Sequence, residues 1–538
     1  MKRRTRILLW VIAAIPLLPL AALLGLALLA RLLYPWPDPV PGVRLEPLRP
    51  PLPDNQIRPD NAFYYLRQLT PIPQRPATEP YRDELIEFRN IGWETGRYPA
   101  CVQCLVELGP NRKLFAQAAA VPNARAEAIH LDSTIAWRYA SRNVAGLLAM
   151  DAERAAAGNR WDDAATSIGI VLRNTAHLTR CGYFSSDVWL GFSRATQSVR
   201  RLAIEKNPPA AWLREMLNCL EGADQHMGPW IEEVRHRRLL HLQCPDLVFS
   251  NLAGLPTAMR RGFEPWYFVG PDTPPPTPRN RRLAWALKVI LPVFGSSPER
   301  SRRHLDVVFS HYLSILEGDN GEKAKADLDP YRLLHMPRQD SWAYWLWLLN
   351  DPVGRVIALK MEIPCMGPSL DDREDRWLES VAGLRAAELT CAIRLYQAEH
   401  EGKPPETLAA LMPQYLARLP DDPFAPAGTP FGYRTNPDGR FVLWCRSMDR
   451  VDHGGRHDIR RVPPDDYEPV PPGDRSSQVS GGPRFRDKYW HQRDFVFASD
   501  DFPKLRALGI EQARERTERE ARSKAEAASQ KPMPGKWW

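Results

Sequence analysis

The chain has 538 residues, of which 44% are hydrophobic, and its 72 basic against 64 acidic residues give a formal net charge of +8. This length and apolar content predict a folded protein of two or three domains and exclude an intrinsically disordered one. The two signs of charge are interleaved, and no basic motif with stacking aromatic residues is present, so we expect no nucleic-acid partner.

The amino terminus carries a long apolar run. Residues 7–30 are 24 consecutive uncharged residues, which exceeds the ~20 that a helix needs to cross a hydrocarbon layer of about 30 Å. Four basic residues within 1–6 precede the run, so the positive-inside rule keeps that end in the cytoplasm. We therefore expect a transmembrane helix over 7–33 in the cell inner membrane, with the bulk of the chain extracytoplasmic. A cleaved signal peptide is the alternative.

Residues 34–60 are rich in proline. Each proline removes a backbone donor and restricts the residue before it, so a regular helix is excluded. We expect an extended stalk that holds the folded part away from the bilayer.

Residues 61–370 have the pattern of an α-helical domain, interrupted by a proline-rich stretch at 264–280. Alanine-rich segments with apolar residues on one broad face predict four consecutive helices with short connections. These helices are expected over residues 132–158, 161–180, 186–206 and 208–224. The result would be an irregular α-helical array that serves as a scaffold.

Three more helical segments are expected, at residues 283–294, 301–316 and 341–362. The first is too short to cross a membrane, which favours a buried or interfacial helix. The last contains Trp342, Trp345 and Trp347, which we expect to pack in a core or between domains rather than to bind carbohydrate.

Two pairs of residues have spacings that are found in redox, metal or ion-pair sites. Cys101 and Cys104 form a Cys-x-x-Cys pair, for which helix-packing thiols or a structural disulfide are favoured over a redox dithiol, because no thioredoxin-like strand pattern flanks it. No second ligand pair follows that would complete a zinc site. Glu232 and His236, four residues apart on a predicted helix, are expected to form a surface pair.

Residues 371–500 change to a mixed pattern. A long helix is predicted over 376–400, with one apolar stripe formed by Leu378, Ala382, Leu389, Ile393 and Tyr396. A shorter helix from 403 to about 417, an Asp-Pro-Phe turn, and strands near 431–434, 440–445 and 494–497 are expected to follow. The fold class is therefore mainly α, with a small carboxy-terminal α+β module that contains a short antiparallel sheet.

The order of elements over residues 385–459 resembles the major pseudopilins of type II secretion. The same cassette is similar to that of membrane-anchored bacterial proteins. The resemblance implies a long helix, a small antiparallel sheet and a calcium loop after it. The chain departs from pseudopilins because it lacks their leader junction, and its apolar run lies far before this module. We therefore expect that it does not polymerise as a pilin.

The loop after the second strand is the candidate metal site. Adjacent glycines can bend the loop and bring the carboxylates of Asp449, Asp452 and Asp458 together with backbone carbonyls, which are the oxygen ligands that calcium prefers. The resemblance implies Ca²⁺ at this place. Two other interpretations stay open: a solvated loop with local turns, and a transition metal bound with the help of His453 and His457.

These features predict a single-pass, membrane-anchored envelope protein with a structural or protein-interaction role and with protein partners in the envelope. A non-enzyme is favoured because no intact catalytic signature is present, so no catalytic residue is assigned. One alternative is a membrane-tethered, metal-dependent hydrolase that uses the aspartates and histidines of the loop. Another is an accessory component of a type II secretion-like apparatus. Residues 501–538 are expected to be a charged, solvated tail.

Overall fold

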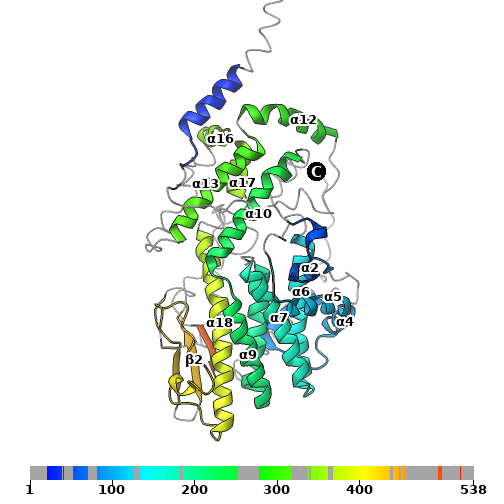
Figure 1. Cartoon of the computed structure of the whole chain (residues 1–538), viewed down its shortest axis with the longest axis vertical. Coiled ribbons are helices and arrows are strands. Elements are labelled where there is room, and N and C mark those ends of the chain that lie inside the picture. Colours follow the sequence, from blue (N-terminus) through cyan, green and yellow to red (C-terminus); the bar gives the residue numbers. More distant parts are fainter. Residues whose placement is uncertain are drawn as a thin grey trace, which may run out of the picture.

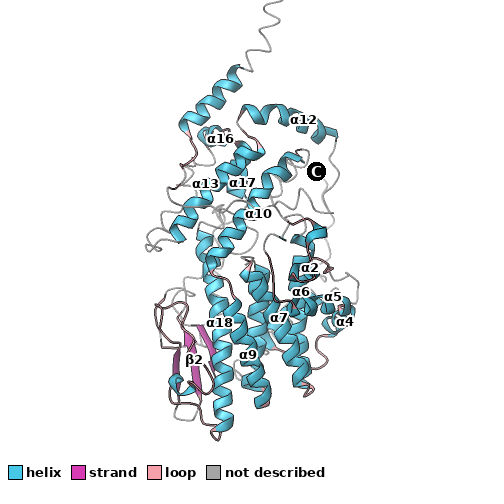
Figure 2. Cartoon of the chain, viewed as in Figure 1, coloured by secondary structure: helices cyan, strands magenta, loops and turns pink. Residues whose placement is uncertain are grey.

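Helices make up most of the computed structural model, and a small antiparallel sheet lies beside the last long helix (Figures 1 and 2). The structure describes, apart from a few isolated positions, residues 21–38, 52–70, 81–125, 134–181, 186–250, 278–294, 296–316, 341–360, 368–436, 440–446, 450–452, 454–455 and 495–499. Most of the proline-rich interruption at 264–280 and nearly all of the tail at 501–538 lie outside these ranges.

Helices occur in both halves of the chain. The first half contains η1 (Asp54–Gln56), α2 (Ala62–Leu66), α3 (Tyr81–Ile91), α4 (Pro99–Glu107), α5 (Gly109–Ala120), α6 (Thr134–Ala157), α7 (Trp161–Arg180), α8 (Ser186–Glu205), α9 (Ala210–His226) and α10 (Trp230–Ser250). The second half contains α12 (Pro278–Val293), α13 (Pro298–Leu316), α16 (Trp342–Leu348), α17 (Pro352–Lys360), α18 (Pro368–Glu399) and η5 (Leu408–Leu411).

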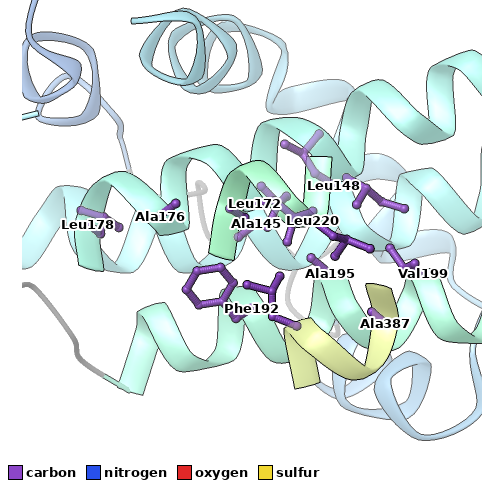
Figure 3. Packing of buried hydrophobic residues seen from close by; sticks show 14 of the residues in the cluster. Ala145, Leu148, Leu172, Ala176, Leu178, Phe192, Ala195, Val199, Leu220 and Ala387 are labelled. Carbon is purple, nitrogen blue, oxygen red and sulfur yellow. The ribbon is translucent and has the colours of Figure 1, made fainter. Parts of the chain in front are cut away.

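Helices α6 to α9 are the four consecutive helices that the sequence predicts, and this prediction is confirmed. They pack against one another, and α8 and α9 also pack against α18 (Figure 1). Small residues such as Ala145 and Ala195 let the helices approach closely, while Leu172, Phe192 and Leu220 fill the space between them (Figure 3). The expected helical scaffold is therefore present.

The centre of α18 is covered on every side. Residues 386–393 are eight consecutive positions, each at most 7% exposed, and they make more than two turns at ~3.6 residues per turn. Helices α8 and α9 and strands β2 and β3 contact this helix. The sequence predicts one apolar stripe on this helix, whereas the structure buries all of its faces. A helix buried in this way has small or apolar residues all round.

The sheet has the order β1-β2-β3, with antiparallel pairing throughout. Its strands are β1 (Gly432–Thr435), β2 (Phe441–Cys445) and β3 (Phe495–Ser499), close to the three predicted strands. All five residues of β2 are buried. Arg200 of α8 fixes β3, because its Nη1 donates to the Phe497 carbonyl oxygen at 3.1 Å and its guanidinium lies 5.0 Å from the Phe497 ring centroid.

Two predicted helices differ from the structure. The segment expected to be helical from 403 to about 417 contains only the short 3-10 turn η5, and Pro413, which has no N–H to donate, follows it. The helix expected over 341–362 is divided into α16 and α17. The division falls at Asp351, whose φ of +60° is not helical, and at Pro352, which suits the first position of a new helix.

The prediction of a transmembrane helix over 7–33 is corrected. Among the residues that the structure describes, no helix is both long enough and apolar enough to cross a membrane. Residues 21–33 are helical. Residues 1–6 and 7–20 lie outside the described residues.

The expected stalk at 34–60 contacts the helical body where it is described. The carbonyl oxygen of Tyr34 accepts hydrogen bonds from Asn350 and Arg355, and that of Asp38 lies 2.8 Å from His311 Nε2. His311 belongs to α13 and Arg355 to α17, and Asn350 lies just before α17. The first residues of the segment are therefore attached to the body instead of extending away from it.

One carboxyl group lies inside the α9–α18 contact. Glu388 is 7% exposed, and burial raises its pKa to about 8. The charges of Asp224 and Glu221 raise this pKa further, whereas Arg385 and Arg418 oppose the rise. The unfolded chain, with an ordinary pKa of 4.5, releases this proton at much lower pH than the folded protein does.

Glu388→Gln should remove a pH dependence of stability. The contribution of Glu388 to the free energy of unfolding is fully present below its pKa in the unfolded chain. It is lost as the pH rises through the folded pKa of about 8. Near pH 4.5 the variant should therefore have the same Tm as the wild type. At pH 8 and above its Tm should be higher, because its free energy of unfolding should be larger by on the order of a few kcal/mol. Thermal unfolding between these pH values measures the difference.

The matched control is Glu401→Gln, because the Glu401 side chain is 87% exposed. Its unfolding curve should follow that of the wild type at every pH. Parallel curves for wild type and Glu388→Gln would show that Glu388 is not a buried, protonated group.

Candidate functional site

The predicted metal loop is described at only one of its three aspartates. Asp449 and Asp458 lie outside the described residues, as do His453 and His457. Asp452 Oδ1 accepts hydrogen bonds from Trp444 Nε1 at 3.0 Å and from the Gly454 backbone N–H at 2.8 Å.

In the described part of the loop, Asp452 is held by hydrogen bonds within the protein. Calcium is bound by several oxygen atoms that surround it. Asp452 Oδ1 instead accepts hydrogen bonds from two N–H groups. The nearby Gly454 carbonyl oxygen is bound by Arg434 Nη1 at 2.7 Å. Within the described ranges, no group of three His, Cys, Asp or Glu residues is arranged to hold a metal ion. Calcium at Asp449, Asp452 and Asp458 stays a prediction.

One glycine of this loop, Gly455, packs against Trp444. Gly454 and Gly455 adopt φ values of +71° and +63°, which glycine tolerates best. A Cβ atom on Gly455 would lie 2.6 Å from the Trp444 ring. Gly455 therefore lies directly against the Trp444 ring.

Sequence reasoning missed a second aspartate next to this loop. Asp422, in the Asp-Pro-Phe turn, is 3% exposed, and its carboxylate accepts the backbone N–H groups of Phe424 at 2.9 Å and Arg446 at 3.0 Å. Burial raises the pKa of Asp422, although these two hydrogen bonds oppose the rise. The turn is thereby tied to the end of β2, which is a structural role.

The Cys-x-x-Cys pair does not have the environment of a redox site. Cys101 and Cys104 are buried in α4, and Cys101 Sγ donates to the Tyr81 carbonyl oxygen at 3.3 Å. Burial raises the pKa of both thiols, and the charge of Glu84 raises that of Cys101 further. The thiolate needed for redox chemistry is therefore disfavoured. Every cysteine among the described residues is a free thiol.

The predicted surface pair of Glu232 and His236 is wrong. Glu232 pairs with Arg235, while His236 is only 4% exposed. His236 therefore lies on the buried side of α10, and Glu232 pairs with Arg235 instead of with His236.

A buried polar centre lies where α13 meets α17, and its middle is Asp351, which is fully buried. Asp351 Oδ1 accepts hydrogen bonds from Ser296 Oγ at 2.6 Å, Ser301 Oγ at 2.8 Å and the Gly354 backbone N–H at 3.1 Å. His304 Nδ1 lies 2.7 Å from Oδ2. Four donors thus surround the carboxylate and stabilise its negative charge away from water. We call these five residues the Asp351 centre.

Arg355 connects the Asp351 centre to the segment at 34–38. The Arg355 side chain is fully buried, and its Nη2 donates to the Tyr34 carbonyl oxygen at 2.6 Å. Its guanidinium lies 4.9 Å from the ring centroid of Trp36 and 4.3 Å from that of Trp347. A cation between the half-buried Trp36 and the fully buried Trp347 is held in place by cation–π attraction.

Burial and nearby charges set the protonation of Arg355 and His304. Burial lowers the pKa of Arg355 to about 9, with Asp351 opposing the change, so the guanidinium stays protonated near neutral pH. Burial lowers the pKa of His304 as well, despite the hydrogen bond to Asp351. A neutral imidazole therefore donates from Nδ1, and Trp36 stacks on its ring with centroids 4.3 Å apart.

The hydrogen bonds indicate what this arrangement can do chemically. An Asp–His pair can orient a general base, but a nucleophilic site requires the hydroxyl to bond to the imidazole. Here Ser296 and Ser301 both donate to Asp351. The Asp351 centre is therefore a structural network that fixes the chain before residue 39 to α13 and α17.

One local signal could have located this centre. Asn350-Asp351-Pro352 is a helix-start pattern, in which a capping aspartate precedes proline at the first helical position. Its partners Trp36 and His304 carry no comparable signal, because they are far apart in sequence.

Comparisons with models of protein families, with curated proteins and with solved structures found no match for this chain. Proposals for its function therefore depend on the sequence and structure of the chain itself.

Gly354→Ala should destabilise the protein, contrary to the usual effect of this substitution in a helix. Alanine in place of glycine normally stabilises a helix by ~0.5–1 kcal/mol. A Cβ atom on Gly354, however, would lie 2.2 Å from Asp351 Oδ2, which is held by its buried hydrogen bonds. We expect a loss of about 1–3 kcal/mol, as for other overpacked sites, measured by denaturant unfolding.

Gly222→Ala in α9 is the matched control, because no atom lies within 4 Å of its added Cβ. This variant should be as stable as the wild type or more stable. If Gly354→Ala gained as much stability as Gly222→Ala, the close packing around Asp351 would be refuted.

Proposed function

We propose that this chain is an interaction scaffold of the bacterial envelope, in which a helical body carries a pseudopilin-like module and presents it to protein partners. The observation that supports this most is the burial of residues 386–393 of α18 on every side. The helix that resembles the long pseudopilin helix is also a central helix of the body, so the module is attached rigidly.

Side chains on both sides of α18 strengthen this attachment. Arg385 Nε lies 3.2 Å from Asp224 Oδ1 of α9, and its Nη1 donates to the Asp421 carbonyl oxygen at 2.9 Å. One arginine thus links the body, the long helix and the Asp-Pro-Phe turn. Arg394, on the same helix, lies 5.3 Å from the ring centroid of Phe441 in β2.

The same burial argues against a role as a filament subunit. A pilin-type filament needs its long helices to pack against one another, whereas α18 is already in contact with α8, α9 and the sheet. Among the accessible parts of the module is the end of β1, where Arg434 and Thr435 are exposed. A short edge strand of this kind presents backbone groups and side chains to other proteins.

Two alternatives compete with this proposal. An accessory role in a type II secretion-like apparatus is favoured by the order of elements, a long helix followed by a small antiparallel sheet. A metal-dependent hydrolase would depend on the loop after β2. The internal hydrogen bonds of Asp452 favour a structural role for that residue.

Photo-cross-linking in the bacterium that carries the gene tests the proposal. A photoreactive amino acid at Thr435, on the exposed end of β1, should form a discrete adduct with one or a few other proteins. The control position is Val106 of α4, which is 72% exposed and lies in the helical body. Adducts specific to position 435 are expected if the module is the presented surface.

Two results would contradict the proposal. A ladder of adducts between copies of this chain would indicate a filament subunit. The same adducts from positions 435 and 106, or none from 435, would show that the module presents no particular surface.

A further inference from the structure

Helix α12 has its charged and aromatic residues on one face and its packed residues on the other. Ala284, Leu287 and Leu291 pack against the core. On the opposite face, Trp285 is 72% exposed. The inner face attaches the helix to the body, so the outer face is presented at a fixed orientation.

Three basic residues surround Trp285 on this outer face. Arg281, Arg282 and Lys288 are exposed, and at four and three residues before and three after Trp285 they lie beside it on a helix. The sequence of α12 contains no Asp or Glu. A tryptophan within a basic, acid-free helix face is typical of helices that lie in the interface of a lipid bilayer.

The same end of the molecule carries further exposed apolar residues. Figure 1 places α12, α16 and the helical residues 21–33 together at one end, away from the sheet. In α16, Trp342 is 73% and Trp345 64% exposed, so the expectation that both pack in a core is wrong, whereas Trp347 is fully buried as expected. We call the exposed residues of α12 and α16 the tryptophan face: Arg281, Arg282, Trp285, Lys288, Trp342 and Trp345.

We infer that the tryptophan face binds the surface of a membrane that contains anionic lipids. This is contact with the headgroup region and not a span across the bilayer. The basic residues are complementary to anionic headgroups, and indole rings favour the boundary between headgroups and acyl chains. The inference rests on α12 and α16 and does not depend on the proposed scaffold role.

The composition favours lipid over a protein partner. A protein interface is enriched in tryptophan and arginine but depleted in lysine, and its basic residues are matched individually by the partner. On α12, in contrast, each side of Trp285 carries basic residues, as expected for many equivalent anionic headgroups. A second copy of the chain would place these basic faces against each other, which like charges disfavour.

Hydrogen exchange of the full chain with vesicles tests the inference. Vesicles of phosphatidylcholine and phosphatidylglycerol should slow the exchange of backbone amides in α12 and α16, and vesicles of phosphatidylcholine alone should do so much less. Arg281→Ser, Arg282→Ser and Lys288→Ser should each weaken binding about fivefold. Replacing Trp285, Trp342 and Trp345 by serine should weaken it at least about tenfold.

The matched control is Ile86→Ser with Val106→Ser, which removes exposed apolar side chains from α3 and α4. These substitutions should leave vesicle binding and the protection of α12 and α16 unchanged. Three results would overturn the inference: protection that does not depend on anionic lipid, protection that persists when the basic residues are replaced, and protection that appears with protein concentration in the absence of vesicles.

Discussion

The complete burial of the middle of α18 is the constraint on which the rest of the structure depends. Residues 386–393 need neighbours on all sides, and these come from two parts of the chain that are distant in sequence, the helices α8 and α9 and the strands β2 and β3. Small residues such as Ala386 and Ala387 allow the neighbours to approach closely. The sheet is too small to be stable alone, so it depends on this helix for its core.

At the opposite end, the Asp351 centre attaches a different part of the chain. The charge of Asp351 favours the protonated form of the buried Arg355, whose guanidinium lies over the Trp36 ring, and Trp36 stacks on His304. The chain that leaves residue 38 therefore starts from a fixed place on α13 and α17. The molecule has two rigid attachments, one to the sheet and one to the amino-terminal segment, with the helical bundle between them.

Part of this fold could be predicted from local pattern. Helices α6 to α9 have regular apolar spacing and short connections, and the hairpin of β1 and β2 has turn residues, so both were located. The burial of α18 on every side could not be predicted, because Ala, Thr and Cys fit a buried face as well as a partly exposed one. The break at Asp351 was missed although the following proline indicates it. For the metal loop, spacing does not reveal that Asp452 accepts hydrogen bonds from Trp444 and Gly454.

Native-state hydrogen exchange across α8, α18 and β2 tests the central claim most directly. If α18 is the shared core, the amides of residues 386–393 and of β2 should exchange only through global unfolding, with the same opening free energy and denaturant dependence as the centre of α8. A lower opening free energy for the sheet together with α18, while α8 keeps its protection, would contradict the account. It would show that the pseudopilin-like module and the helical body are separate units.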